Sequence, residues 1–493
     1  MTLTLVLYTI VGAAIGLLMG ALPGITVTMT AVLVVSLTYG WPMAEALAFI
    51  VGAFCGGVTG GCISAIALNI PGTSAAVATA FDGFPLKERG EADNALSLGL
   101  ASSFLGGLIG LAIMLVLGPV IGTFALRFGS HEYFLITLWG LTLVAVLSRG
   151  NIVKGLCSAF FGLFVGMIGM DPIMGMLRFT YGTGILKGGI DFVAAMIGLF
   201  GMKEVFKQLS KKSSFNISGT SYSIKGLLPK PHLLKRVWHT ILWGGPLGTL
   251  IGLLPGTGGD VGCIVAYGVA KQVTKNPSRP FGEGAYEGVA APEVANNAAI
   301  GGALTTMMTL GVPGDSVTAV ILGSFYLHGL LPGPTFMLTE KHYFYLIAAI
   351  VLVGTIMAYI FGILGSNLIL KAINLPKWFL VPFITTLCIV GSYAIKNNMY
   401  DVIIMIVFGI IGYLFEKGGF PVGPVVLAII LGPMIERNLR QALIASGGVV
   451  PFLTALVTKP ISLILLILII LSFVLQSKVM RAAENKVKDA KAG

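Results

Sequence analysis

Apolar runs of nearly membrane-spanning length recur from one end of the chain to the other. Clear cases are residues 3–20, 98–117, 345–364, 402–415 with its neighbours, and 461–475. A helix of about 20 apolar residues is long enough to cross the hydrocarbon core of a bilayer. By this criterion the sequence predicts roughly ten to thirteen spans, a range that reflects the Gly and Pro residues interrupting the runs. The predicted fold class is an all-α polytopic membrane protein.

Composition supports the membrane assignment. Only 10% of the residues are charged and 56% are hydrophobic, whereas a soluble domain has about 25% charged residues. With so few charges, a chain of 493 residues could not cover a water-facing surface. The 67 glycines favour close helix packing and interrupted helices in a membrane. The five cysteines lie in apolar sequence without metal-ligand spacing, so neither a disulfide framework nor a metal centre is predicted.

The net charge of +11 arises largely in two basic segments, and these divide the chain. The positive-inside rule places both segments in the cytoplasm. The predicted organisation is a first membrane repeat (1–207), a basic cytoplasmic linker (208–235), a second membrane repeat (236–477) and a basic cytoplasmic tail (478–493). The N-terminal segment lacks a positively charged start, so it is expected to be a retained first span and not a signal peptide.

Two sequence motifs occur once in each half, in the same order. Gly20–Gly24 reads GALPG and Gly252–Gly256 reads GLLPG. Leu68–Ser74 and Leu310–Ser316 share a Pro-Gly pair and a closing Ser. The copies of each motif are separated by a similar length of chain, so the sequence predicts an internal repeat. The N-terminus carries no basic side chain that would hold it inside, so inverted repeats are expected, with interrupted helices at matching positions.

The interruptions suit ion and carboxylate binding. Proline removes a hydrogen bond from a helix, and glycine tolerates unusual backbone angles. A helix that restarts after such a break presents free N–H groups and a positive dipole end, which bind anions without Arg or Lys. Gly24 leads into Thr26, Thr28 and Thr30, whereas the second half supplies Asp260 and Asp315. Intramembrane carboxylates are usually functional, and these two are expected to bind Na⁺ or to carry H⁺.

The predicted substrate- and ion-binding residues are Pro23, Gly24, Thr26, Asn69, Pro71, Gly72, Thr73, Ser74, Pro255, Gly256, Thr257, Gly258, Gly259, Asp260, Asn296, Asn297, Pro313, Gly314, Asp315 and Ser316. The hydroxyl and acidic members could instead cap helix N-termini. Pro292 and Glu293 fit the start of a helix, with Asn296 and Asn297 on its first turns. These amides could bind a substrate carboxylate or an ion, or they could hydrogen-bond neighbouring helices.

The sequence favours no catalytic chemistry. Residues 256–260 resemble a phosphate-binding loop but lack its lysine and follow a membrane span. There is no plausible nucleophile–base pair and no metal-ligand cluster in the sequence. The protein is therefore predicted not to be an enzyme and to need no cofactor beyond a coupling ion. A membrane scaffold without transport activity would not require the repeated breaks.

At these motifs the chain resembles the large membrane subunit of the tripartite tricarboxylate transporters, the TctA-type family. The resemblance covers nearly the whole chain and is strongest at residues 20–24, 68–74, 252–259, 287–297 and 310–316. It implies a bacterial inner-membrane symporter that works with a small membrane subunit and a periplasmic solute-binding protein.

The resemblance also implies a substrate class and a mechanism. The expected substrates are organic acids such as citrate-like di- and tricarboxylates, and a Na⁺ or H⁺ gradient drives uptake. Alternating access is expected, and analogy with other inverted-repeat transporters adds an elevator-type movement. The alternative is a carboxylate or anion channel that is not coupled to an ion gradient.

Overall fold

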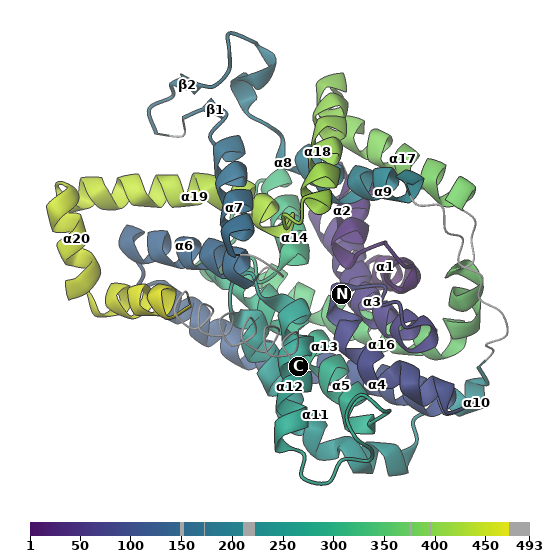
Figure 1. Ribbon diagram of the computed structural model, residues 1–493. Helices are drawn as coiled ribbons and strands as arrows, with labels where there is room; N and C mark the ends of the chain where they lie inside the picture. The colour runs from purple at the N-terminus through teal and green to yellow at the C-terminus, as the bar shows by residue number, and fades with distance from the viewer. Residues whose placement is uncertain (148–151, 172, 211–221, 374–376, 395, 473–493) are drawn as a thin grey trace, which may run out of the picture. The chain divides into compact units, whose positions relative to one another are not determined.

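The computed structural model describes residues 1–147, 152–171, 173–210, 222–373, 377–394 and 396–472 (Figure 1). By its internal contacts the chain forms two compact units. Unit 1 comprises residues 1–125 and 191–414, and unit 2 comprises residues 126–190 and 415–493. Each predicted sequence half contributes to both units, so the units and the predicted repeats divide the chain in different ways. The predicted cytoplasmic tail, 478–493, and the centre of the predicted linker, 211–221, lie outside the described residues.

Unit 1 is entirely helical within the described residues. Its elements are α1 (Leu3–Ala21), α2 (Val27–Leu37), α3 (Met43–Leu68), η1 (Ser74–Ala76), α4 (Val77–Glu88), α5 (Ala92–Ala125), α8 (Phe192–Met196), the π-helical η3 (Ile197–Met202), α9 (Lys203–Ser210), α10 (Ile224–Leu227), α11 (Pro231–Leu253), α12 (Gly258–Val273), α13 (Tyr286–Leu310), α14 (Ser316–Leu327), α15 (Phe336–Thr339), α16 (Lys341–Ile373), α17 (Lys377–Ala394) and most of α18 (Met399–Lys417).

Unit 2 contains helices and one small hairpin within the described residues. Its elements are α6 (Ser130–Leu147), α7 (Ile152–Gly166), β1 (Gly169–Met170), β2 (Leu177–Arg178), η2 (Ile185–Gly188), α19 (Gly423–Ser446), α20 (Val449–Thr458) and a further helix at Pro460–Ser472. The two-residue strands pair antiparallel, with Gly169 opposite Arg178. Apart from this hairpin, the predicted all-α architecture is confirmed.

Five described helices are long and apolar enough to cross a membrane: α1, α3, α5, α16 and α18. Helices α19 and α20, which meet at a bend of 99°, add a sixth if they are counted as one span. The number is lower than the ten to thirteen spans predicted. The difference arises because breaks at Gly and Pro divide apolar sequence into helices such as α2 and α14, which are too short to cross alone.

The core of unit 1 is built around α3 and α13. Residues 46–67 of α3 and 287–309 of α13 are buried without a gap. A helix enclosed on all sides needs no polar face, and both helices are accordingly rich in small apolar residues. Such residues let neighbouring backbones approach closely, as in other membrane helix pairs.

Helix α1 packs on α3 through a row of glycines that recur at every fourth position. A Cβ atom at Gly16 would lie 2.1 Å from the Ala53 carbonyl oxygen, and one at Gly20 would lie 2.1 Å from that of Gly57. Atoms cannot approach so closely, so only glycine fits at these positions. This spacing keeps the row on one face of α1, which is the small-residue pattern of close membrane helix pairs.

Helix α11 packs on α13 at the corresponding positions. A Cβ atom at Gly248 would lie 2.2 Å from the Ala295 carbonyl oxygen, and one at Gly252 would lie 2.3 Å from that of Ala299. Gly248 precedes the second GxLPG motif by the same number of positions as Gly16 precedes the first. Ala295 likewise precedes its Pro-Gly motif as Ala53 precedes the matching one in the first half. The motifs and the helix contacts therefore share one spacing.

All four Pro-Gly motifs separate consecutive helices. They lie between α1 and α2, between α3 and α4, between α11 and α12, and between α13 and α14. Asn69 and Gly311 end α3 and α13 in the left-handed conformation, with φ of 55° and 71°. The predicted interruptions are therefore present, and each one starts a new helix in the interior of unit 1.

The predicted helix start at Pro292 is wrong. Helix α13 begins at Tyr286, with Ala285 at its N-cap, and Pro292 lies inside it. A proline near an acidic residue is typical of a first turn. Here the lost hydrogen bond is tolerated because α13 is held on several sides by α3, α5, α11 and α12. Glu293, Asn296 and Asn297 are consequently in the middle of a buried helix.

Candidate functional site

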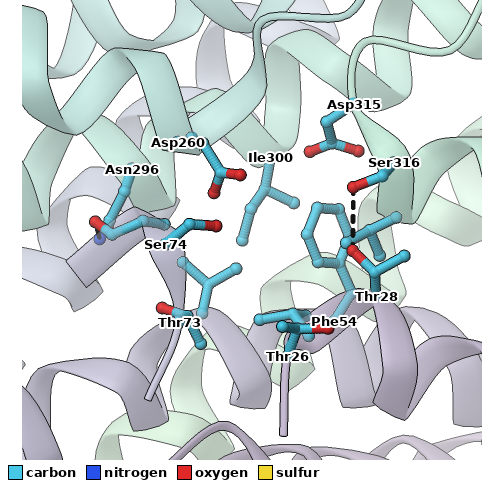
Figure 2. A pocket seen from close by; sticks show the side chains of 15 residues that line it. Thr26, Thr28, Phe54, Thr73, Ser74, Asp260, Asn296, Ile300, Asp315 and Ser316 are labelled. Carbon is cyan, nitrogen blue, oxygen red and sulfur yellow. Dashed lines mark hydrogen bonds between the residues drawn. The ribbon is translucent and has the colours of Figure 1, made fainter. Parts of the chain in front are cut away.

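The four restarted helices of unit 1 begin around one small cavity (Figure 2). It has about 40 Å³ open to water-sized solutes. That is enough for a water molecule or a bare ion. The cavity is lined by Thr26, Val27, Thr28, Phe54, Val58, Thr73, Ser74, Ala75, Gly259, Asp260, Asn296, Ile300, Asp315, Ser316 and Val317.

The starts of α2 and α4 give the cavity a face made of hydroxyl groups. Thr26 is the N-cap of α2, and its Oγ1 accepts a hydrogen bond of 3.1 Å from the Met29 N–H. Thr73 and Ser74 precede α4 through η1. The Thr73 side chain is 4% exposed, and its hydroxyl has no hydrogen-bond partner within the described part of the chain. Among the described lining residues, this face carries no acidic or basic side chain.

The starts of α12 and α14 give the opposite face two carboxylates. Asp315 is the N-cap of α14, where its Oδ1 accepts from the Thr318 N–H at 2.7 Å and the Thr318 hydroxyl accepts from the Asp315 N–H. Asp260 lies in the first turn of α12 and is exposed to solvent. Both side chains face the cavity in Figure 2. The described residues that line the cavity include no Lys, Arg or His.

This charge arrangement favours a cation. Two carboxylates that face one cavity repel each other, and a bound cation would relieve that repulsion. Carboxylate, hydroxyl and amide oxygens are the ligands that hard cations prefer. No group of three or more His, Cys, Asp and Glu side chains that could hold a metal ion occurs in the described residues. The oxygen atoms that line the cavity are two carboxylates with neighbouring hydroxyl and amide groups.

Contacts across the cavity join the two halves of the sequence. The hydroxyls of Thr28 and Ser316 lie 2.9 Å apart, the dashed line in Figure 2. On the other side, the Asn296 side-chain amide donates to the Ala75 carbonyl at 3.0 Å. Within the second half, Gly258 has a φ of 51° and lies so close to Asp315 that a Cβ atom would be 2.4 Å from the Asp315 Cβ. The cavity is therefore shared between the halves.

Comparison with known proteins identifies the family. Residues 6–427 match the model of the tripartite tricarboxylate transporter TctA family. The chain belongs to the TctA family.

Two proteins of Agrobacterium vitis are similar to this TctA-family chain. The first, described as an uncharacterized 52.8 kDa protein in the TAR-I ttuC' 3'region, is 34% identical over 90% of this chain and 88% of its own length. The second, an uncharacterized protein in the TAR-II ttuC' 3'region, is 39% identical over 44% of this chain and 89% of its own length. No solved structure matches the chain.

In this TctA-family chain the structure brings eight of the predicted site residues to the cavity surface. They are Thr26, Thr73, Ser74, Gly259, Asp260, Asn296, Asp315 and Ser316. The others do not line it: Pro23, Gly24, Asn69, Pro71, Gly72, Pro255, Gly256, Thr257, Gly258, Asn297, Pro313 and Gly314. Their part in binding stays a prediction.

Several of the residues off the cavity surface have a visible structural role. The Thr257 hydroxyl donates to the Leu254 carbonyl at 2.9 Å and so closes the break before α12. The Gly256 N–H donates to the Pro313 carbonyl at 3.3 Å, which ties the two breaks of the second half together. Gly72 and Gly314 pack against the carbonyl oxygens of Gly20 and Gly252. These residues shape the breaks that carry the cavity-lining side chains.

Six apolar lining residues have no counterpart in the prediction: Val27, Phe54, Val58, Ala75, Ile300 and Val317. Phe54 and Val58 come from the middle of α3 and Ile300 from the middle of α13. The predicted site residues lie beside the Pro-Gly motifs or belong to the Asn296–Asn297 pair, so apolar residues within the helices were not among them. Spacing alone held a signal, because Phe54 and Val58 lie one helical turn apart on a helix next to a break.

Proposed function

We propose that this chain is the large translocating subunit of a binding-protein-dependent secondary transporter that imports organic acids of the citrate-like di- and tricarboxylate class. A Na⁺ gradient drives uptake, with H⁺ as the alternative coupling ion. The observation that best supports this proposal is that four helices begin, after interruptions, around one cavity lined by the carboxylates of Asp260 and Asp315. Interrupted helices meeting at a shared site are typical of secondary transporters. An uncoupled channel is not favoured, because the family is a transporter family.

The two faces of the cavity are suited to different ligands. Asp260, Asp315 and Ser316 supply oxygen ligands for the cation. Thr26, Ser74 and the positive ends of α2 and α4 suit one carboxylate of the substrate. A substrate carboxylate beside a bound cation would link the two binding events, because each neutralises the other's charge.

The repeated packing of the interrupted helices supports alternating access. The shared spacing of the α1–α3 and α11–α13 contacts supports two repeats of one design, and inverted repeats would give inward- and outward-facing states by exchanging roles. An elevator-type movement of the interrupted helices is one way to make that exchange.

The proposed assembly follows the tripartite system that gives the family its name. A periplasmic solute-binding protein delivers the substrate, and a small membrane subunit completes the complex in the bacterial inner membrane. The basic linker 208–235 and tail 478–493 lie on the cytoplasmic side in this proposal, in accordance with the positive-inside rule.

Reconstituted transport tests this proposal. Proteoliposomes contain the chain with its small partner, and labelled citrate is supplied with the cognate binding protein under an imposed Na⁺ gradient or, separately, a pH gradient. The proposal predicts concentrative uptake that needs the binding protein and one of the two gradients. Uptake that only equilibrates, whatever the gradient, would support the channel instead. If citrate is not transported, a panel of other di- and tricarboxylates is supplied in the same vesicles, and failure of the whole panel rejects the proposal.

A further inference from the structure

A buried carboxylate lies directly behind the cavity. Glu293, in the middle of α13, is 0% exposed. Its Oε1 accepts a hydrogen bond of 2.5 Å from the Thr79 hydroxyl of α4, and its Oε2 accepts one of 2.7 Å from the Ser103 hydroxyl of α5. No ion pair of the described residues includes Glu293. Burying an acid that is held only by neutral donors costs free energy. Such acids in membrane proteins usually have a function.

Glu293 also holds the amide of Asn296. The Asn296 Nδ2 donates to Glu293 Oε2 at 3.5 Å and to the Ala75 carbonyl at 3.0 Å. Both partners are acceptors, which fixes which end of the amide is nitrogen. An amide has two N–H donors, so both are used by these bonds. Asn296 therefore has no donor left for a ligand in the cavity.

The oxygen of Asn296 is the end that remains available. Oδ1 accepts a bond of 2.6 Å from the Asn297 side-chain amide, which uses one of its two lone pairs. The Asn297 amide is itself fixed, because its Nδ2 also donates to the Glu293 backbone carbonyl and its Oδ1 accepts from Thr59 at 3.1 Å. Asn296 lines the cavity with Asp260 and Asp315, so it can add a third oxygen ligand there.

We propose that Glu293 is a positioning residue of the cation site: by accepting the Asn296 Nδ2–H, it holds the Asn296 oxygen ready for the coupling cation. This inference rests on the proposed function and adds a residue outside the cavity to it. Acceptors that orient a metal ligand from behind typically change metal affinity about 10- to 100-fold when they are removed. The same network could instead only join α4, α5 and α13, and that alternative predicts different kinetics.

Two substitutions separate these roles. Glu293→Gln keeps an oxygen acceptor for Asn296 and can turn its own amide toward Thr79, whereas Glu293→Met fills a similar volume with only a weakly accepting sulfur. Glu287→Gln is the matched control, because Glu287 is a buried acid on the same helix, 3% exposed, that pairs with Arg236 and Ser278 away from the cavity. Each full-length variant is reconstituted with its partners, and the Na⁺ concentration for half-maximal citrate uptake is measured beside the maximal rate.

The expected result is specific to positioning. Glu293→Met raises the half-maximal Na⁺ concentration about 10- to 100-fold, and Glu293→Gln stays within about threefold of wild type. Glu287→Gln lowers thermal stability without changing the Na⁺ response. In an Asn296→Ala background Glu293→Met has little further effect, because the two residues act through one interaction.

Three outcomes overturn the inference: an unchanged Na⁺ response in Glu293→Met, an equal loss in Glu293→Gln, or additive effects with Asn296→Ala. If Glu293→Met does not fold, Asn296→Ala alone replaces it, since it removes the oxygen that Glu293 is proposed to position. An unchanged Na⁺ response in Asn296→Ala also overturns the inference. Wild-type uptake is measured first. A wild type without cation-coupled uptake removes the proposed function and this inference together, whereas coupled wild-type uptake with any of the three outcomes removes only the inference.

Discussion

The α1–α3 pair and the α11–α13 pair are packed alike but serve different chemistry. In both pairs glycines on the first helix touch the backbone of the second, at positions that correspond in the two halves of the chain. In both, the helices end at Pro-Gly motifs and restart at the cavity. Yet the restarted helices of the first half carry Thr26, Thr73 and Ser74 there, whereas those of the second half carry Asp260 and Asp315.

This difference separates the residues that build the cavity from those that choose its ligand. The glycines and prolines fix where the helices approach and break, and they are common to both pairs. A few polar side chains at the restarts then decide whether a face attracts a cation or a carboxylate. Substitutions of the two kinds should therefore differ in effect, the first acting on folding in both pairs and the second on binding in one.

The largest effect is expected from filling the glycine contacts. Gly16→Val and Gly248→Val place side chains about 2 Å from the carbonyl oxygens of Ala53 and Ala295, and overpacking of this kind costs about 1–3 kcal/mol and occasionally more. Both variants should lower the midpoint of thermal unfolding in detergent, by similar amounts. Gly268→Ala, with nothing within 4 Å of the added carbon, is the control and should not lower stability, because alanine in a helix interior is favoured over glycine by about 0.5–1 kcal/mol. If only one of the two valine variants lost stability, the α1–α3 and α11–α13 contacts would not be equivalent.

The next effect concerns the acidic face. Asp315→Asn keeps the N-cap of α14, since Asn caps as well as Asp, but removes a charge from the cavity. We expect the half-maximal Na⁺ concentration for uptake to rise more than about tenfold, a loss of about 1.4 kcal/mol in cation binding. Asp260→Asn should act in the same direction. An unchanged ion dependence in both variants would show that neither acid belongs to a cation site.

A smaller effect is expected from the hydroxyl face. Thr26→Ala removes the N-cap bond to Met29, which costs about 1 kcal/mol of helix stability, and it removes a hydroxyl from the proposed carboxylate site. The KM for citrate should rise about fivefold for a loss of about 1 kcal/mol in binding, with the Na⁺ response unchanged. Thr26→Ser is the control and should behave as wild type. A shift in the Na⁺ response without a change in KM would reverse the proposed roles of the faces.

The smallest effect is expected from Asp171 of unit 2, an acid that pairs with Arg440. In unit 2, the Met174 and Ile173 N–H groups, together with Arg440, lower the pKa of Asp171 to about 2. Because this folded-state pKa is below the unfolded value of about 3.9, the ionised form contributes stability above about pH 4 and loses it as the pH falls toward about 2.

Asp171→Asn should remove that part of the acid-induced loss. Thermal unfolding of wild type and variant is compared between pH 2 and pH 5. Identical pH dependence in the two proteins would contradict the assigned pKa.

The sequence predicted the interruptions well because they are local. A Pro-Gly pair breaks a helix wherever it lies, so Pro23, Pro71, Pro255 and Pro313 could be placed without the structure. The repeated motifs only implied a shared site. The structure shows that one cavity is lined by Asp260, Asp315 and Thr73.

Other features depend on packing and could not be predicted. Phe54 and Ile300 line the cavity from the middle of helices where no motif marks them. Helix α13 continues through Pro292 because its neighbours enclose it. Glu293 and Asn296 are neighbours because they lie three positions apart on α13. The hydroxyls of Thr79 and Ser103 that hold Glu293 come from α4 and α5, and no spacing along the chain reveals them.

Radiolabelled Na⁺ entry into the same proteoliposomes tests the central claim most directly, because it follows the ion itself. We predict that citrate with its binding protein stimulates Na⁺ entry in wild type, and that Asp315→Asn abolishes the stimulation at Na⁺ concentrations that support wild-type uptake. Citrate uptake without any accompanying Na⁺ entry, or full stimulation in Asp315→Asn, would contradict it.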